Sequence, residues 1–489
     1  MNLPSTFSPL LPRSRRLALA APLFAAVILS GCNVGPKYKL PSAQLAPFHN
    51  APAIEARPAQ GPAPQIDAWW KGFEDADLDR IVQRVLDQNL DLAASLTRVA
   101  QARALAKQMG AQNKPRVNLS AQDTSLRQSL QSPFGKVGNL IPGYDRNQNY
   151  YDLGVQASWE LDLFGQMKNG ALAATAEAQA AEAARSGTRI TVVADAVDAY
   201  LQVRSYQRHI HYAQAQIDTA QHLFDLVSQR YNAGVATKME LAQAEALLQQ
   251  AKASLPPLRI ALEVQLNRLD VLMGAQPGTY ANELSKPAAI PATPSLAGLS
   301  DPVDTLRRRP DVIAAEREVA ASNARVGAAL AGYYPSVSLS ALLGYETVTP
   351  GSLFRSATFQ PQSIAGIRWR IFDFGRVSAE VAQARGSNAE ALIRYRQTVL
   401  GAAADVENAF ISLSESEARQ QEVVRAVEAL QKNRDLAEQA YQAGTIPLLD
   451  VLDADRQLLA AQDDLAAAQT NSARAAVSSF RALGGGWKR

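Results

Sequence analysis

Apolar residues recur at two spacings along this chain, and the two spacings predict two kinds of element. The longest helical pattern runs from Gln166 to Ala233, with no proline and many good helix formers. Its second half carries an apolar seam with a period of 3.5 residues, which favours a left-handed supercoil with neighbouring helices. The seam residues are Tyr206, Ile210, Ala213, Ile217, Ala220, Phe224, Val227 and Tyr231. A second proline-free stretch, from Arg376 to Ala443, predicts another helix of the same length.

Strict alternation of apolar and polar residues, the pattern of a β-strand, occurs in four runs. The runs cover residues 117–122, 151–162, 337–346 and 365–371. In the second run, for example, Leu153, Val155 and Ala157 alternate with Gln156 and Ser158. A soluble sandwich has the same alternation. Aromatic residues at the strand ends, and the lack of other strands to cover the apolar face, favour a sheet that faces lipid.

A sheet in lipid must close, because lipid cannot satisfy the backbone of an open edge strand. Closed membrane barrels have about eight strands or more, and the sequence of this chain predicts only four. We therefore expect the chain to oligomerise, so that several copies complete one barrel.

The chain also contains a tandem repeat. Matching residues lie 220 positions apart before the strands and 210 positions apart after them, so the first copy has a loop about ten residues longer between Pro115 and Trp159. The matching segments are Trp159–Gly165 with Trp369–Gly375, Tyr231–Gly234 with Tyr441–Gly444, and Asp91 and Pro115 with Asp311 and Pro335.

Helix lengths predict how the helices stack. In the first copy, the segments 85–113 and 237–273 add up to about the length of the long helix, with a break expected near Asn89. Two short helices placed end to end therefore match one long helix, which gives two helical columns per repeat and four per chain. Pro256 and Pro257, with the proline-rich connector from Ala275 to Ser300, are expected to form irregular structure outside the columns.

Cys32 is the only cysteine of the chain, so an intrachain disulfide is impossible. It ends a short apolar run that follows three arginines, and the residues Leu29, Ser30 and Gly31 before it resemble a bacterial lipobox. The alternative is a buried thiol. The resemblance implies a covalent lipid on Cys32 and no other cofactor. Asn33 stands where aspartate would signal retention in the inner membrane, which favours the outer membrane.

These patterns divide the chain into five parts. Residues 1–31 form a signal peptide, 32–66 a lipidated proline-rich strap, 67–274 the first repeat, 275–304 an irregular connector, and 305–489 the second repeat. Each repeat is expected to run in the order helix, strand pair, long helix and hairpin helix.

Charge and chemistry exclude two classes of function. The net charge of +3 comes from the signal segment, and the formally neutral remainder argues against a nucleic-acid partner. The four histidines have no carboxylate at metal-ligand spacing, and the chain has neither a phosphate loop nor a nucleophile elbow. We therefore expect no enzyme activity and no metal site. The run Arg307–Arg309 is compatible with an anion site, but a solvated run is favoured.

Several segments resemble the outer membrane factor family of TolC-like channels, most closely its OprM/NodT-type efflux lipoproteins. They are Cys32–Tyr38, Trp69–Phe73, Arg309–Val312, and the duplicated Trp…Phe-Gly and Tyr-x-x-Gly motifs. The resemblance implies an α+β membrane protein, in which a tandem-duplicated protomer contributes four strands to a trimeric outer-membrane β-barrel and long helices to a periplasmic α-helical barrel. It also implies a passive exit duct for small molecules in a tripartite efflux pump. The implied partners are a periplasmic adaptor and an inner-membrane transporter of the RND type.

The turn after each long helix is a candidate site. Gly234–Glu240 combines a helix-ending glycine with a Thr-x-x-Glu capping box, and Gly444–Asp450 is its counterpart, with Pro447 near a helix start. Plain hairpin capping explains these residues. The resemblance adds that the turns are adaptor-docking tips, formed by Gly234, Val235, Ala236, Thr237, Gly444, Thr445 and Ile446.

Asp450 and Asp453 match aspartates that narrow the periplasmic entrance in TolC-like channels. The alternative is that they are first-turn acids that complement a helix dipole. Three copies would place six carboxylates around one axis, where they repel each other and attract cations. Ile446 stands where the best-known member has an arginine, so the resemblance does not imply the charge network that locks that gate.

Two other functions are open at this point. Within the family, the alternative is the outer-membrane component of a type I secretion system. Outside it, the alternative is a trimeric coiled-coil stalk or adhesin without a channel. A stalk needs neither an internal duplication nor paired alternating strands, and this favours the duct.

Overall fold

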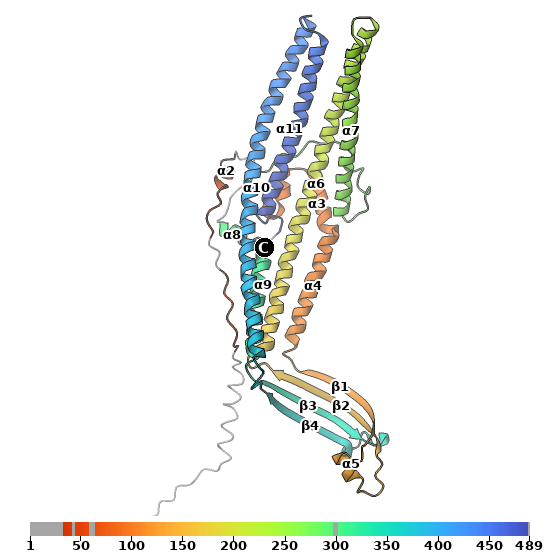
Figure 1. Cartoon of the computed structure of the whole chain (residues 1–489), viewed down its shortest axis with the longest axis vertical. Helices are drawn as coiled ribbons and strands as arrows, with labels where there is room; N and C mark the ends of the chain where they lie inside the picture. The colour runs from red at the N-terminus through yellow and green to blue at the C-terminus, as the bar shows by residue number, and fades with distance from the viewer. Residues whose placement is uncertain (1–32, 42–44, 58–63, 297–301, 488–489) are drawn as a thin grey trace, which may run out of the picture. The chain divides into compact units, whose positions relative to one another are not determined.

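The computed structural model describes residues 33–41, 45–57, 64–296 and 302–487. Within them, helices and strands follow the same order twice (Figure 1). The first repeat consists of α3 (Ala76–Gln88), α4 (Leu90–Ala111), β1 (Arg116–Arg127), β2 (Asn147–Leu161), α6 (Gln166–Asn232) and α7 (Lys238–Leu272). The second consists of α8 (Pro302–Arg307), α9 (Pro310–Ala331), β3 (Ser336–Thr347), β4 (Phe359–Arg368), α10 (Arg376–Gln442) and α11 (Leu448–Ala482). The predicted duplication, the two long helices and the four strands are confirmed.

Five short elements lie between or before these. They are α2 (Ala51–Glu55), η1 (Ile66–Phe73), α5 (Pro133–Gly138), η2 (Pro350–Ser352) and η3 (Ser356–Thr358). Helix α5 lies in the β1–β2 loop, which is longer than the β3–β4 loop, as the change of repeat offset predicts.

The chain forms two compact units, and each contains parts of both repeats. Of the described residues, the first unit comprises 33–40, Gln101–Ala178 and Arg317–Leu392, and the second comprises those within 41–100, 179–316 and 393–487. The boundaries between them fall inside α4, α6, α9 and α10.

The first unit contains an antiparallel sheet with the strand order β1-β2-β3-β4. Its register pairs Leu119 with Val155 and Val155 with Leu343, so the alternating apolar positions of neighbouring strands share one face. The predicted run 365–371 extends beyond the observed strand, because β4 ends at Arg368, opposite Ser336 at the start of β3. Among the described residues, none of the helices combines the length and the apolar character that a membrane crossing requires.

The second unit has a core built around Trp69. Its indole is fully buried and stacks on Phe480 of α11, with ring centroids 5.2 Å apart and an interplanar angle of 9°. Residues of η1, α3, α6, α7 and α11 complete this cluster, so the Trp-Trp-Lys-Gly-Phe segment is part of the core of the second unit. Further along α6, Ala213 and Ile217 pack on Leu248 and Leu255 of α7. The apolar seam therefore joins the two helices of the hairpin.

Asn89 separates α3 from α4, as predicted. It also marks the place where the end of α7 meets the start of α4. The Asn89 side chain accepts a hydrogen bond from the Leu92 amide and donates one of 2.9 Å to the carbonyl of Leu272, the last residue of α7. Gly274 then turns the chain in a left-handed conformation with φ +70°. A Cβ at Gly274 would lie 2.5 Å from the Gln88 carbonyl, so the close approach of the two helix ends requires glycine there.

The prediction for Pro256 and Pro257 was wrong, because α7 continues through both. A proline inside a helix removes a backbone hydrogen bond and costs about 3 kcal/mol or more. Leu248 and Leu255 are buried against α6 before the prolines, and Leu258 packs there after them. Apolar packing on both sides outweighs the lost hydrogen bonds. The described part of the connector, by contrast, has no helix or strand from Ala275 to Leu296, as predicted.

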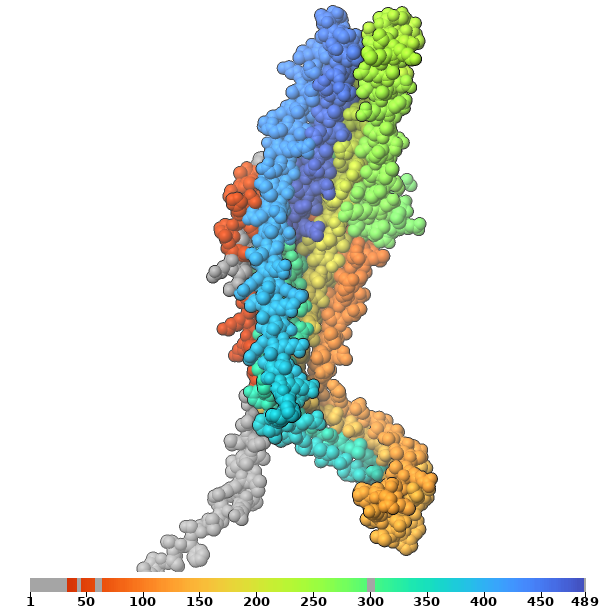
Figure 2. All heavy atoms as spheres, viewed as in Figure 1, coloured from red at the N-terminus to blue at the C-terminus, as the bar shows by residue number. Residues whose placement is uncertain are grey.

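The strap crosses the surface of α10 in the second unit (Figure 2). The Glu407 carboxylate accepts hydrogen bonds from the backbone amides of His49 and Asn50, at 2.5 and 2.9 Å. Arg57 forms a bidentate pair with Glu417, with distances of 2.6 and 2.7 Å. Because its backbone and its guanidinium are both bound to α10, this part of the strap is a fixed element and not a loose linker.

Candidate functional site

The turn after α6 closes with two known capping devices. Gly234 has φ +74°, and the amide of Val235 donates to the carbonyl of Arg230 at 2.8 Å, which is a Schellman motif. Thr237 then begins α7: its hydroxyl accepts from the Glu240 amide at 3.2 Å, and the Glu240 carboxylate accepts from the Thr237 amide at 2.6 Å. Both halves of the predicted capping box are present.

The turn after α10 has the same glycine but a different helix start. Gly444 has φ +72°, and Thr445 donates from its amide and its hydroxyl to the carbonyl of Ala440. Pro447 takes the N-cap position of α11, where no side chain caps the helix. The two turns therefore fix the chain reversal in the same way and stabilise the following helix differently.

The two turns present mainly exposed backbone and small side chains. Val235 is 67% exposed, Gly234, Thr237, Gly444 and Thr445 are exposed, and Ala236 and Ile446 are half-buried. A groove of about 200 Å³ is lined by Ala236 and Glu240 from the first turn and Leu449 from the second helix start. The structure thus brings the predicted tip residues of both repeats to one end of the second unit.

The two candidate gate aspartates have different surroundings. Asp453 accepts hydrogen bonds from Arg456 Nη2 at 2.8 Å and Gln457 Nε2 at 2.7 Å, and the bond from Arg456 holds the pKa of Asp453 below its usual value. Asp450 is exposed, and its carboxylate has no hydrogen bond or ion pair to any described residue. Of the two candidate gate aspartates, only Asp450 has a charge that no described residue of the same chain compensates.

A larger groove, which sequence reasoning missed, runs behind the turns between the α6–α7 hairpin and α11. It has a volume of about 680 Å³, and Asp453 and Arg456 lie along it. Its apolar lining comes from Leu223, Leu247, Leu449 and Leu452. None of these leucines belongs to the apolar seam of the long helix, and only the spacing of the hairpins in the structure makes them border an open groove.

The prediction of a solvated run was wrong for Arg309. This side chain is buried and donates to Asp311, to Asp405 at 2.8 Å, and to the carbonyls of Ala402 and Ala482 at 3.3 and 3.0 Å. Burial alone lowers the pKa of the guanidinium, and the bonds and charges of the two aspartates outweigh it, so its pKa is raised. Since every part of the guanidinium is bound within the chain, Arg309 joins helices and is no anion site.

The histidines form no metal site within the described residues, where no group of three possible ligands occurs. His209 Nδ1 instead lies 2.5 Å from the Asp463 carboxylate, so this pair connects α6 with α11. No sequence spacing links the two residues, which lie 254 positions apart.

Cys32 lies outside the described residues, but the next residue is well positioned. Asn33 and Asn169 bond through both amide groups: Asn169 Nδ2 donates to Asn33 Oδ1 at 2.7 Å, and Asn33 Nδ2 donates back at 3.4 Å. A Cβ at Gly165, which has φ +82°, would lie 2.8 Å from the Asn33 side chain. Asn33 therefore packs against the turn between β2 and α6, within the first unit.

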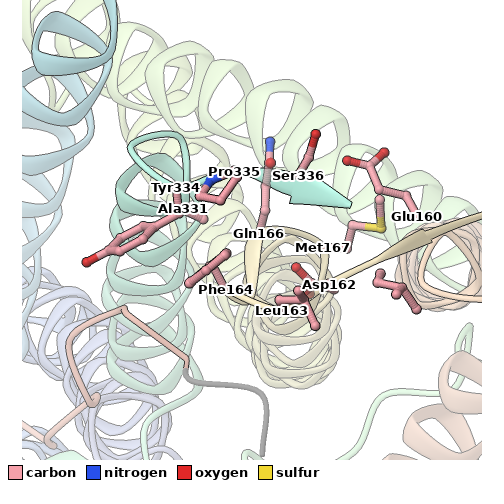
Figure 3. A pocket seen from close by; sticks show the side chains of 11 residues that line it. Glu160, Asp162, Leu163, Phe164, Gln166, Met167, Ala331, Tyr334, Pro335 and Ser336 are labelled. Carbon is pink, nitrogen blue, oxygen red and sulfur yellow. The ribbon is translucent and has the colours of Figure 1, made fainter. Parts of the chain in front are cut away.

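The same turn borders a small cavity of about 30 Å³ between the two repeats (Figure 3). Phe164 and Tyr334 stack beside it, with ring centroids 4.6 Å apart and an interplanar angle of 16°. Trp159 and Trp369 each donate from the indole to a backbone carbonyl, of Asn113 and Tyr333 respectively. The two tryptophans are repeat equivalents with equivalent partners, so they close the helix-to-strand turn of each repeat.

Comparison with known proteins agrees with this architecture. The model of the family described as outer membrane efflux protein matches residues 81–275 and 302–485. The pyoverdine export outer membrane protein OpmQ of Pseudomonas aeruginosa is 32% identical over 426 residues, which cover 87% of this chain and 89% of that protein. Nodulation protein T of Rhizobium leguminosarum bv. trifolii is 29% identical over 452 residues, 90% of this chain and 92% of its own.

Among solved structures, the outer-membrane channel OprN is similar, with a TM-score of 0.83 and 33% identity. The match covers 93% of this chain and 100% of that chain. The family consists of outer-membrane channels and not of enzymes, in agreement with the predicted absence of catalytic groups. The chain is therefore a member of the outer membrane efflux protein family.

Proposed function

We propose that the chain is the exit duct of a tripartite efflux pump, a passive outer-membrane channel for small molecules handed over by an inner-membrane transporter and a periplasmic adaptor. The observation that carries the proposal is the pairing, in each repeat, of a strand hairpin with an apolar face and a long helical hairpin that ends in an exposed turn. The names of relatives support small-molecule export: OpmQ is named for pyoverdine export, and TtgC of Pseudomonas putida for toluene efflux.

The strand count requires an oligomer, and the resemblance to TolC-like channels implies that the oligomer is a trimer. The described sheet has two open edges, β1 and β4, whose backbone groups cannot stay unpaired in lipid. Three copies supply about twelve strands, within the range of known membrane barrels. In planar bilayers, the full-length lipoprotein extracted from outer membranes should give discrete single-channel conductance steps. A non-channel stalk or adhesin would give none, and a complete lack of conductance would overturn the proposal.

The faces of the sheet can be tested with one pair of variants. Val155 lies on the apolar face and Ser158 on the opposite face of β2. Val155→Arg should therefore reduce the amount of inserted, assembled protein, at a cost of about 2–4 kcal/mol near the midplane, and Ser158→Arg should be tolerated. Equal insertion of the two variants would contradict a lipid-facing sheet.

The adaptor is proposed to dock on the turns at Gly234–Thr237 and Gly444–Ile446. Their exposed backbone, held by left-handed glycines, supports close approach of a partner helix. A photo-crosslinking amino acid at Val235 or Ile446 should capture the adaptor in cells, whereas the same group at Phe134, exposed in the β1–β2 loop, should not. Capture by Phe134 alone, or by none of the positions while the adaptor is expressed, would exclude the turns as docking tips.

Asp450 and Asp453 are proposed to line the periplasmic entrance. Because Arg456 already compensates Asp453, the free carboxylate of Asp450 should contribute more to cation attraction. Asp450→Asn should therefore weaken cation selectivity and block by multivalent cations more than Asp453→Asn. If cation selectivity is unchanged in both variants, Asp450 and Asp453 only stabilise the start of the helix and do not line the entrance.

The lipid anchor is proposed to be Cys32, in the outer membrane. The reciprocal amide pair of Asn33 and Asn169 supports this assignment, because it fixes the residue next to the cysteine at the turn between β2 and α6. Metabolic labelling with palmitate should be lost in Cys32→Ser and unchanged in Asn169→Ala. Labelling that persists in Cys32→Ser would exclude the anchor.

A further inference from the structure

The pair of His209 and Asp463 bridges the two helical hairpins of the second unit. The α6–α7 hairpin is here called the first hairpin, the α10–α11 hairpin the second hairpin, and the part of each between this pair and its turn the turn half. His209 Nδ1 of α6 lies 2.5 Å from the Asp463 carboxylate of α11. Within the turn halves, the described residues form no hydrogen bond or ion pair that joins the two hairpins. No polar contact therefore fixes the distance between the turn halves.

The groove of about 680 Å³ described above occupies the turn halves. Its lining residues lie within 216–223 on α6, 243–254 on α7 and 449–460 on α11, so all of them are between the His209–Asp463 pair and the turns. The groove thus begins where the bridge between the hairpins ends. Its width depends on how far apart the two turn halves stand.

Helix α7 has a weak point at the base of this groove. Pro256 and Pro257 lie inside the helix, next to Leu258. Leu258 packs on the same apolar cluster as Ile210, the neighbour of His209, so the prolines lie near the level of the bridge. A proline has no N–H, so two carbonyls one turn earlier in α7 lack their helical donor. The backbone of α7 is therefore least restrained where the groove begins.

The second hairpin has no such weak point. The equivalents of the two prolines, 210 positions later, are Ala466 and Ala467 of α11. Alanine is the best helix former and keeps its N–H group. Helix α11 therefore retains the two backbone donors that α7 lacks.

Ion pairs also hold the helices of the second hairpin together. Arg419 of α10 pairs with Asp464 of α11 at the level of the bridge, because Arg419 is the repeat equivalent of His209. Nearer to the turn, Arg434 Nε donates to Asp455 at 2.9 Å. The second hairpin is therefore fixed by charged contacts at two levels.

The first hairpin lacks both of these ion pairs. Neither pair of equivalent residues can form one, since these residues are His209 with Ser254, and Phe224 with Glu245. In its turn half, the described side chains form one hydrogen bond between α6 and α7, of 3.4 Å from Lys252 Nζ to Gln221. Otherwise the apolar seam joins the two helices, and apolar contacts allow small displacements more easily than paired charges do.

We propose that the first hairpin bends at Pro256 and Pro257 while the second hairpin stays straight, so that the groove widens and narrows about the His209–Asp463 pair. Helix α6 follows this bend by the gradual curvature that long helices adopt. The inference goes beyond the proposed export function. It concerns the hairpins of one chain, and it is true or false whether or not the chain conducts.

Distances between spin labels, measured by pulsed electron resonance, test the hinge. Labels at Gln250→Cys on α7 and Gln457→Cys on α11 lie on the two sides of the groove. Full-length protein in detergent, produced together with an excess of unlabelled chain, should give a broad distribution of distances. Adding Pro256→Ala/Pro257→Ala should reduce its width at least twofold, because alanine restores both backbone donors and favours the helix. A sample without the new cysteines gives the contribution of Cys32.

The matched control lies in the second hairpin, with labels at Lys432→Cys on α10 and Gln457→Cys on α11. Its distribution should be narrow, with the prolines and without them. A narrow distribution across the groove in the presence of both prolines, or an equal width after their replacement, would overturn the hinge. A control distribution as broad as that of the groove would show that bending is not confined to the first hairpin, and this too would overturn the proposal.

Replacement of the bridge tests the fixed point of the motion. His209→Ala should broaden the distribution across the groove further, because the base of the groove is then no longer held, and it should leave the control pair unchanged. His211→Ala, an exposed neighbour on α6, should have no such effect. If His209→Ala leaves the width as it was, the His209–Asp463 pair is not the point about which the groove opens.

Discussion

The two repeats join their stacked helices at equivalent positions with different chemistry. In the first repeat the neutral amide of Asn89 bonds the carbonyl of Leu272, and in the second the guanidinium of Arg309 bonds that of Ala482. Asn89 and Arg309 are repeat equivalents, as are Leu272 and Ala482. In both repeats, therefore, a side chain donates to the carbonyl of the last residue of the hairpin helix, but an asparagine does so in the first repeat and an arginine in the second.

The aspartates around this joint have been kept as well. Asp405, which Arg309 binds, is the equivalent of Asp195, and Asp195 pairs with Arg268 of α7. The equivalent of Arg268 in α11 is Ser478. In each repeat, therefore, one arginine pairs with this aspartate, Arg268 of α7 in the first repeat and Arg309 before α9 in the second. The two repeats share the charge balance at this place but not the residue that supplies the positive charge.

The largest effect is expected for Arg309→Ala. It leaves two buried carbonyls and two aspartates without their donor, at a cost of about 2–4 kcal/mol. Thermal unfolding in detergent measures the loss. Arg307→Ala, an exposed neighbour, should change the stability by less than about 0.5 kcal/mol. Equal unfolding temperatures of the two variants would show that the joint of the second repeat does not depend on the guanidinium.

A smaller effect is expected for Asn89→Ala, which removes one bond to Leu272 and the N-cap of α4, for about 1–2 kcal/mol. Asn89→Asp keeps the cap acceptor and loses the donor to Leu272, so its unfolding temperature should lie between those of the wild type and Asn89→Ala. If Asn89→Asp behaved like the wild type, the bond between the stacked helices would contribute nothing.

The turns after α6 and α10 also differ between the repeats. The helix that follows the first turn, α7, has a side-chain cap, and the helix that follows the second, α11, has none. Thr237→Ala should destabilise the start of α7 by about 1 kcal/mol, measured as faster amide hydrogen exchange in its first turn. Pro447→Ala removes no capping bond and should leave exchange in α11 nearly unchanged. Similar acceleration in both helices would remove this difference between the repeats.

A lower pH should reduce the difference in stability between the start of α7 and the start of α11. The amide and hydroxyl of Thr237 bond the Glu240 carboxylate and hold the pKa of Glu240 below its usual value. A lowered folded-state pKa means that the capping box stabilises α7 above the ordinary glutamate pKa, and that this stabilisation is lost as the pH falls through the lowered value. Exchange in α7 that does not respond to acid, relative to α11, would contradict the capping role of Glu240.

The smallest effect is expected when the positive charge at position 268 of the first repeat is moved to position 89, the equivalent of Arg309 in the second repeat. Arg268→Ser should cost about 0.5 kcal/mol, because its pairs with Asp195 and Asp198 are partly exposed. Adding Asn89→Arg should recover part of that loss, since an arginine there would lie near Asp91 and Asp195. The four unfolding temperatures form a cycle, and a penalty for Asn89→Arg that is equal in both backgrounds would exclude the exchange.

The structural features that depend on the periodicity of apolar residues were predictable from the sequence. The 3.5-residue seam ends with the long helix, the alternating runs are strands, and the offsets of 210 and 220 agree with the strand register. The break expected near Asn89 is observed between α3 and α4. The capping box at Thr237 was predictable because all of its contacts lie between Thr237 and Glu240, within one helical turn.

Contacts between distant segments were not predictable from one sequence. Arg309 reads as part of a charged run, and only the ends of α9 and α11 together with Asp405 of α10 bury it. The helix through Pro256 depends on leucines that contact α6, and the groove beside Asp453 depends on the spacing of two hairpins. Local rules fail at these places because the deciding neighbour belongs to another helix, far away along the chain.

The attachment of the strap has a consequence for the order of folding. The amides of His49 and Asn50 bind Glu407, and Arg57 binds Glu417, across most of the length of the chain. These strap residues are among the first of the folded chain to be synthesised, but the two glutamates that bind them follow only with α10. Closing so long a loop is slow and costs chain entropy. Strap docking should therefore be among the last steps of maturation, and its completion reports that the second repeat has folded.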